Sequence, residues 1–246
     1  MTPAVRRLCL VHLAANALLL WLGYEWLGVG ESTIPRLLWS AVFALAILSM
    51  ACWLHGATFA YFRMPDGSRI TAAFRAALQC LLPLLLVAIG IMALYALLAR
   101  WADYSPQPAL KLASYLTLKF RKPVKPATVM AGFNLALWLV RWVLLPLVLL
   151  PMASAIATRG WRGFAEVGWC GRAWLLAPVF LLAGLWLPFV LLGWVPRMGP
   201  FWLQMASFLV RIGLAYLLFV AAAIALAFVT SRGRAVLGKP GTVTSP

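Results

Sequence analysis

Six long apolar runs dominate this sequence, and they constrain its fold more than any other feature. About 20 residues of α-helix, at a rise of 1.5 Å each, cross the hydrocarbon core of a bilayer. The chain is 65% hydrophobic, against roughly 45–50% apolar residues in an average globular domain. We therefore predict an all-α integral membrane protein in which residues 1–235 form one polytopic domain, followed by a flexible tail over residues 236–246. The six transmembrane helices are expected at residues 8–29, 34–62, 76–101, 129–158, 173–195 and 201–230.

The runs share features that indicate a repeated helical hairpin. Segments 34–62, 129–158 and 201–230 each end in a short stretch that combines arginine with glycine. This similarity predicts six helices arranged as three hairpins, which is a weak internal repeat. Prolines remove helix hydrogen bonds, so several of the helices are expected to be kinked. The prolines concerned are Pro83, Pro146, Pro151, Pro178 and Pro188.

The positive charge of the chain lies mainly at the ends of the apolar runs. Lysine and arginine number 21 and aspartate and glutamate only 5, which gives a formal net charge of +16. A nucleic-acid-binding protein presents such charge on a water-exposed scaffold. This chain has no room for one, so we expect no nucleic-acid partner. Basic residues at helix ends instead contact anionic lipid headgroups, and those expected to do so are Arg69, Arg141, Arg162, Arg211 and Arg234.

The distribution of basic residues also predicts an orientation. With the N-terminus inside, the inner side collects most of the arginines, and both termini are then cytoplasmic. Arginine exceeds lysine, and alanine, glycine and proline are abundant. This composition is typical of a GC-rich bacterium, so we expect a multi-pass protein of a bacterial cytoplasmic (inner) membrane.

One basic stretch does not fit this orientation, because it falls on the outer side. It lies between the third and fourth runs and contains Lys111, Lys119, Arg121, Lys122 and Lys125. Leu112, Leu116 and Phe120 recur every four positions, and Lys111, Ser114, Arg121 and Lys122 take the other side. This pattern predicts a short amphipathic helix over residues 109–122 in the headgroup plane. We expect a partner or interfacial surface here; the alternative is a solvated linker helix.

Two arginines lie within apolar runs. An arginine at the bilayer centre costs roughly 2.5–3.5 kcal/mol. An apolar stretch follows each of these arginines, Arg141 and Arg211. Each stretch is long enough, or nearly long enough, to span the membrane alone. We therefore place both arginines at the outer interface. The alternative is an intramembrane anion or proton site at Arg141.

Each of the two histidines follows a cysteine by three positions, as Cys9 with His12 and Cys52 with His55. Residues three apart share a face of a helix. Two cysteines and two histidines can bind zinc or copper, whereas the histidines alone can ligate haem or a chlorophyll-type magnesium. The alternative is ordinary helix packing. Depth favours packing, because the pairs lie about 4 Å and about 13 Å from the inner ends of their runs and are thus out of register.

No catalytic arrangement is apparent in the sequence. The five carboxylates are scattered, and there is no phosphate-binding glycine loop, nucleophile elbow or zinc-protease motif. We therefore expect a non-enzymatic protein, foremost a structural or accessory subunit that packs against other membrane protein subunits and lipid. Two alternatives stay open. One is a small transporter or lipid-handling protein, and the other is a haem-, chlorophyll- or metal-binding subunit of an electron-transfer or light-harvesting complex.

Overall fold

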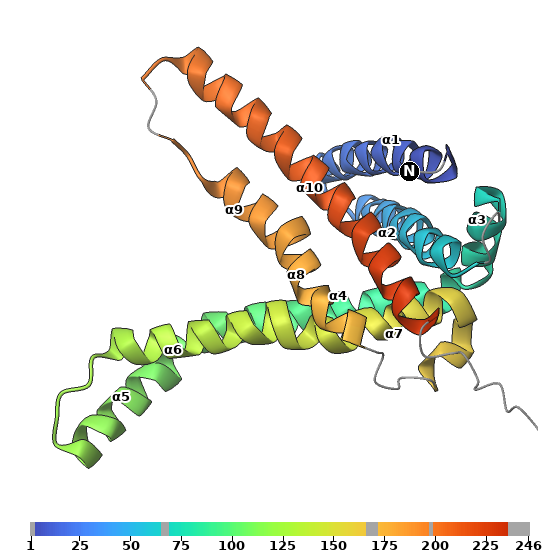
Figure 1. The fold of residues 1–246 in the computed structure, drawn as a ribbon. Coiled ribbons are helices and arrows are strands. Elements are labelled where there is room, and N and C mark those ends of the chain that lie inside the picture. The colour runs from blue at the N-terminus through green and yellow to red at the C-terminus, as the bar shows by residue number, and fades with distance from the viewer. Residues whose placement is uncertain (1–2, 65–68, 166–171, 197–198, 236–246) are drawn as a thin grey trace, which may run out of the picture.

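The fold is helical throughout the part of the chain that the structure, a computed structural model, describes. That part comprises residues 3–64, 69–165, 172–196 and 199–235, without the side chains of residues 172, 173 and 232–235. It contains no β-strand, and six of its helical segments are long and apolar enough to cross a membrane (Figure 1). The prediction of an all-α chain with six candidate spans is confirmed. The predicted flexible tail, residues 236–246, lies outside the described residues.

Short connections join the helices along the chain. The α-helices are α1 (Pro3–Leu27), α2 (Ile34–Arg63), α3 (Ile70–Gln79), α4 (Leu81–Tyr104), α5 (Pro106–Phe120), α6 (Pro126–Leu139), α7 (Leu145–Arg159), α8 (Ala177–Leu181), α9 (Leu187–Gly193) and α10 (Phe201–Ala235). The π-helical turns are η1 (Val140–Leu144) and η4 (Leu182–Trp186), and the 3-10 turns are η2 (Gly160–Phe164) and η3 (Arg172–Leu176). Proline stands in the first turn of several helices, where its missing N–H would have no helical partner in any case.

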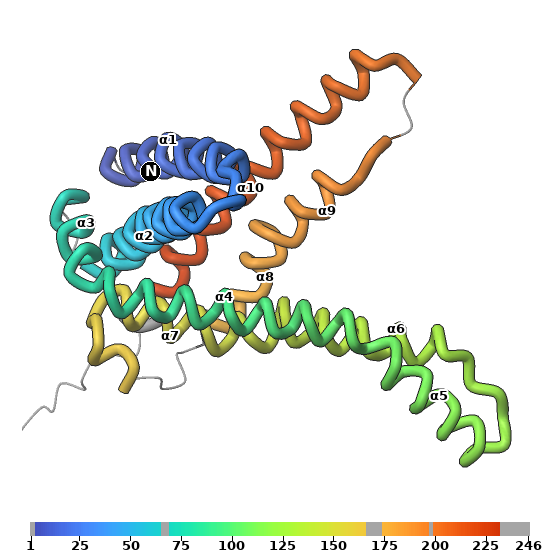
Figure 2. Tube along the Cα trace, turned by 180° about the vertical axis from the view of Figure 1, so that it is seen from behind, coloured from blue at the N-terminus to red at the C-terminus, as the bar shows by residue number. Residues whose placement is uncertain are grey.

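The helices form a bundle from which two arms extend (Figures 1 and 2). Helix α2 is central, because it contacts α1, α3, α4, α7 and α10. The first arm consists of α5 and α6, which continue beyond the pair formed by α4 and α7. The second arm consists of α9 and the first half of α10, which lie against each other. In the most apolar part of each span only 11–22% of the residues are buried, so most of these residues are exposed or only partly buried.

The third apolar run is divided between two helices. Helix α3 ends at Gln79, and α4 starts two residues later. Pro83 accounts for the break, because it has no N–H to donate and its ring clashes with the carbonyl of Gln79, four residues earlier. Helix α3 folds against α2, where the indole N–H of Trp53 donates to the carbonyl oxygen of Phe74 (2.8 Å). The prediction of one helix over residues 76–101 is therefore wrong at its start.

Both π-helical turns begin six residues before a proline. Turn η1 starts at Val140 and precedes Pro146, and turn η4 starts at Leu182 and precedes Pro188. A proline ring displaces the carbonyl one turn earlier, and a π-helical turn is one way in which a helix accommodates that displacement. The predicted bending of the helix axes at these prolines stays a prediction.

A separate helix occupies the basic segment between α4 and α6. Helix α5 covers Pro106–Phe120, so it begins and ends slightly earlier than the predicted range of 109–122. It stops at Arg121, whose φ of 51° is left-handed. The backbone N–H of Val124 then donates to Oγ1 of Thr117 (3.0 Å), which closes the turn. The position of α5 in the headgroup plane stays a prediction.

Candidate functional site

The two histidines of the chain meet in the bundle, where α1 lies against α2. The ring centroids of His12 and His55 are 5.4 Å apart, and the rings are tilted by 56°. Helix α1 begins at Pro3, five residues before the predicted run, so His12 lies about 13 Å into its helix. His55 lies about 12 Å before the end of α2 at Arg63. The two depths match, and the predicted mismatch is wrong because α1 starts earlier than expected.

A closed set of hydrogen bonds surrounds His12. Its side chain is fully buried, and Nε2 is hydrogen-bonded to Oγ1 of Thr58 on α2. The Thr58 hydroxyl donates to the carbonyl oxygen of Leu54 (3.0 Å), so its oxygen accepts from the Nε2–H of His12. The side-chain amide of Asn16 donates to Nδ1 of His12 (3.2 Å) and to the His12 carbonyl (2.8 Å). Both ring nitrogens are thus engaged within the protein, which leaves His12 no lone pair for a metal.

This group, which we name the His12 cluster (His12, Asn16 and Thr58), joins α1 to α2. A neighbouring hydrogen bond joins α1 to α10, because the hydroxyl of Tyr216 donates to the carbonyl oxygen of Leu13. Polar contacts between membrane helices hold neighbours together where hydrophobic burial gives no preference for one arrangement. The His12 cluster and the Tyr216 hydrogen bond together are therefore best explained as a structural junction of three helices.

His55 has different surroundings, although it lies beside His12. Its ring contacts the ring of Phe219 on α10 edge-on, with centroids 5.9 Å apart. Within the described ranges its nitrogens have no hydrogen-bond partner. No side-chain nitrogen or oxygen of those ranges is both buried and unpaired, so the imidazole nitrogens are open to the space beside them. That space is a cavity.

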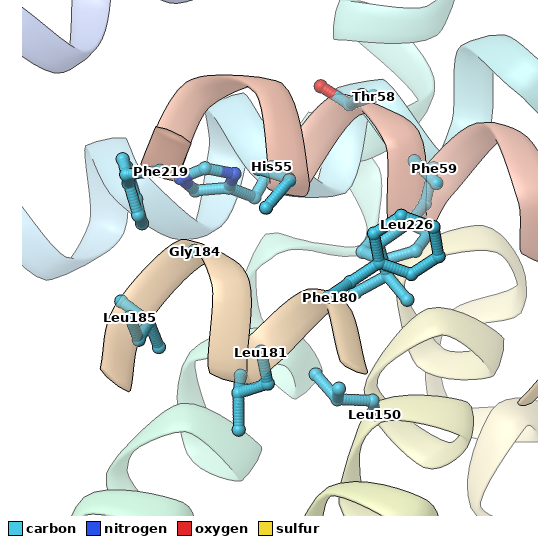
Figure 3. A pocket seen from close by; sticks show the side chains of 13 residues that line it. His55, Thr58, Phe59, Leu150, Phe180, Leu181, Gly184, Leu185, Phe219 and Leu226 are labelled. Atoms are coloured by element: carbon cyan, nitrogen blue, oxygen red, sulfur yellow. The ribbon is translucent and has the colours of Figure 1, made fainter. Parts of the chain in front are cut away.

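The cavity has a volume of about 230 Å³ and lies between α2, α7, α8, η4 and α10 (Figure 3). Its walls are apolar except for His55 and Thr58, and the hydroxyl of Thr58 is already paired. Aromatic rings come from three elements of the wall, as Phe59, Phe180 and Phe219. The cavity is partly open to the outside of the bundle.

A close approach of η4 to α10 forms one wall of the cavity. A Cβ atom placed on Gly184 would lie 2.5 Å from the Cβ of Ala222. This separation is far below van der Waals contact, so only glycine allows the π-helical turn to approach α10 so closely. Nothing in the apolar sequence around Gly184 had indicated this contact.

The cysteines of the predicted metal site do not join the histidines in one ligand set. Across the described ranges, no group of three or more His, Cys, Asp or Glu side chains is placed to hold a metal ion. Cys52 packs instead against the core cluster between α4 and α7. Cys9 and Cys52 are free thiols. The structure thus brings together only the two histidines of the four predicted ligands.

Arg211 is bound to the end of α9. Its side chain is only 8% exposed, and Nη1 donates to the carbonyl oxygens of Leu191 (3.1 Å) and Trp194. The last carbonyls of a helix lack intrahelical partners and carry partial negative charge, so a guanidinium there is favourable. Arg211 therefore fastens α10 to α9 in the second arm. Its predicted contact with lipid headgroups stays a prediction beside these protein contacts.

Arg63 makes a comparable contact between α2 and α7. One terminal nitrogen donates to the carbonyl oxygen of Ser154 (3.0 Å) and to Oγ1 of Thr158 (2.7 Å). The other donates to the Ser154 hydroxyl (2.5 Å). Sequence reasoning missed this junction, although two hydroxyl residues four positions apart at the end of an apolar run are a usable signal.

The other basic residues singled out from the sequence are placed as follows. Arg69 and Arg162 are exposed, and the side chain of Arg234 lies outside the described residues. Arg141 is half-buried in η1, where its backbone carbonyl accepts a hydrogen bond from the Tyr95 hydroxyl (2.7 Å). All five residues of the basic segment are exposed on α5 and the turn after it, namely Lys111, Lys119, Arg121, Lys122 and Lys125.

Comparison with known proteins gives no relative for this chain. No protein-family model matches the chain, and neither the curated proteins nor the solved structures contain a significant match. The function must therefore be inferred from the arrangement of the residues themselves.

Proposed function

We propose that the chain is a non-enzymatic, multi-pass membrane protein that serves as a structural or accessory subunit of a larger membrane complex. The shape of the second arm carries this proposal. Helix α9 and the first half of α10 extend away from the bundle (Figure 1) and expose large apolar side chains, among them Phe189 and Phe201, each 76% exposed. A transporter that acts alone encloses its route between helices, whereas a projecting pair of helices offers both faces to another subunit.

In the proposed arrangement the six spans form three hairpins with kinked helices in a bacterial inner membrane, with both termini cytoplasmic. Helix α5 lies in the headgroup plane. Its exposed Leu112 (39%) and Phe120 (61%) support this position, because they lie on the side of the helix away from Lys111 and Lys122, and an interfacial helix buries its apolar side among the acyl chains and leaves its basic side at the surface.

The basic side chains of α5 and its following turn then face anionic headgroups or an acidic surface of a partner subunit. Arg69, Arg141, Arg162 and Arg234 are assigned to headgroup contacts in the same way. The charge of each residue is worth about 1 kcal/mol near an anionic surface, so the five basic residues of the α5 segment together form the strongest such patch in the first arm.

Photo-crosslinking in the native membrane tests the proposal. Benzoylphenylalanine is placed at Phe189 or Phe201 in the second arm, and at the exposed Leu20 of α1 (63%) as a matched control. We expect one discrete protein adduct from both arm positions and only lipid adducts from the control position.

Other results would contradict the proposal. If all three positions give only lipid adducts and the chain extracted in lipid nanodiscs has the mass of a single 27.0 kDa copy, it acts alone. If the arm positions crosslink to a second copy of the same chain, it is a self-assembling protein rather than an accessory subunit.

A further inference from the structure

The cavity beside His55 combines apolar walls with one polar group that has no partner in the described residues. Leaving an imidazole unpaired in an apolar environment is unfavourable, because it has given up hydrogen bonds to water. Since His55 lies about 12 Å along α2 from Arg63, within a candidate span, water is scarce around it. A ligand that pairs with the imidazole would remove this penalty.

The wall chemistry restricts what that ligand can be. No lining residue carries a formal charge, so an ionic ligand would be desolvated without compensation. A plain acyl chain would leave the imidazole unpaired. Phe219 lies on one side of the cavity and Phe59 and Phe180 on the other (Figure 3), and a cavity with aromatic rings on two sides suits a flat conjugated ring.

The volume of the cavity and its open side restrict the ligand further. A volume of about 230 Å³ is below the roughly 300–1,000 Å³ of pockets for drug-sized ligands. It admits a single ring rather than a macrocycle such as a porphyrin. The cavity is partly open to the outside of the bundle, where a hydrophobic tail attached to the ring would lie among lipid acyl chains. The wall formed by η4 is a π-helical turn, a feature found frequently at functional sites.

We propose that this cavity binds the ring of a neutral, lipid-soluble quinone. The N–H of the His55 imidazole donates a hydrogen bond to a ring carbonyl, the three phenylalanines contact the ring, and the tail leaves through the open side. The proposal concerns binding alone. It extends the proposed function by giving the accessory subunit a small-molecule site, and it does not depend on a partner subunit.

Thermal unfolding of the purified full chain in detergent micelles tests it, with decylubiquinone as the probe at fixed mole fractions in the micelle. A ligand that binds only the folded state raises the unfolding temperature. Decylcyclohexane, which has a similar tail and a ring without carbonyls, serves as the matched probe. We expect a saturable rise with decylubiquinone and none with decylcyclohexane.

Two pairs of variants locate the site. Ala223→Leu fills the cavity, whereas Ala221→Leu adds the same atoms on an exposed position of the same helix. We expect the first to weaken decylubiquinone binding at least about 10-fold and the second to leave it within about 2-fold. His55→Leu should weaken binding about 3- to 10-fold, and His55→Gln, which keeps an N–H donor, should recover most of that loss.

Three results would overturn the proposal. Equal stabilisation by both probes would mean that the cavity takes any apolar chain. Unchanged binding in Ala223→Leu would place the probe elsewhere, and unchanged binding in His55→Leu would remove the imidazole from recognition. Circular dichroism and gel filtration confirm that each variant is folded before it is titrated.

Discussion

The two histidines lie in ring contact, yet their surroundings are opposite. His12 is fully buried with both nitrogens hydrogen-bonded to Thr58 and Asn16. His55 is half-buried beside a cavity, and its nitrogens have no partner in the part of the chain that the structure describes. The difference shows that residue type and depth do not decide a role. The role of each histidine depends instead on whether its ring nitrogens are already hydrogen-bonded within the protein.

The two histidines also differ in whether their hydrogen-bonding groups serve the stability of the fold or are free to bind a ligand. A satisfied polar group in a membrane bundle contributes to the packing of helices, and its loss leaves a partner unpaired. An unsatisfied polar group does not stabilise the folded state without ligand, and it is available to pair with a ligand. We therefore expect substitutions around the His12 cluster to change unfolding and those at His55 to change it hardly at all.

The largest effect is expected from a substitution in the wall of the cavity, at Gly184. Gly184→Ala places a methyl group 2.5 Å from the Cβ of Ala222, so α10 must move away from η4. We expect the free energy of unfolding to fall by about 2–3 kcal/mol, measured by denaturant unfolding in mixed micelles. Gly90→Ala, which has open space around its new methyl group, should be neutral or stabilising. Adding Ala222→Gly to Gly184→Ala should restore most of the loss, and a failure to do so would contradict the contact.

A smaller effect is expected on the His12 side. Thr58→Val keeps the shape of the side chain and removes the oxygen that accepts from His12. We expect a loss of about 1–2 kcal/mol in the free energy of unfolding, since a buried N–H loses its partner. Thr128→Val, at an exposed position of α6, is the control. Equal unfolding of both variants would show that the His12 cluster does not hold α1 to α2.

The hydrogen bond between α10 and α1 should matter less. Tyr216→Phe removes the donor to the Leu13 carbonyl, and interhelical hydrogen bonds in membrane proteins average about 0.6 kcal/mol. We expect a decrease of about that size in the free energy of unfolding. Tyr24→Phe, at a position 74% exposed, should cause no change. A loss above about 2 kcal/mol would mean that the hydroxyl has a larger role than one bond explains.

The smallest effect on the free energy of unfolding is expected at His55. His55→Leu removes no hydrogen bond within the described structure and roughly preserves side-chain volume. In the absence of added ligand we expect the free energy of unfolding to stay unchanged or to rise by up to about 0.5 kcal/mol, because the substitution removes a half-buried imidazole that has no hydrogen-bond partner in the described residues. A loss as large as that of Thr58→Val would show that His55 is a structural residue like His12.

Sequence reasoning succeeded where the signal is additive along the chain. The six apolar runs predicted six candidate spans, because about 20 apolar residues suffice to identify one whatever surrounds it. It failed at Pro83, where a single ring ended α3 and divided the expected helix. It also placed His12 too near the end of its helix, because residues 3–7, which precede the first predicted run, belong to α1.

The candidate site was predictable only in part. The spacing of Cys52 and His55 correctly placed both on one helix, and the convergence of His12 with His55 agrees with the proposed pairing of their helices. Membership of a site depends on the faces that neighbouring helices present. Cys52 turned out to pack toward α4 and α7, while His55 reached a cavity made with α8, η4 and α10. The closeness of η4 to α10 rests on Gly184 and Ala222, two small residues among many in this sequence.

The sequence by itself determined that this protein is helical, with six apolar helices suited to a membrane, because hydropathy and helix length are local properties. The tertiary structure decided which histidine is enclosed and which is open. It also decided that Arg211 binds the end of α9 and that Arg63 binds α7. Those outcomes depend on contacts between segments as many as 95 residues apart, where lipid-facing and protein-facing positions have the same apolar composition.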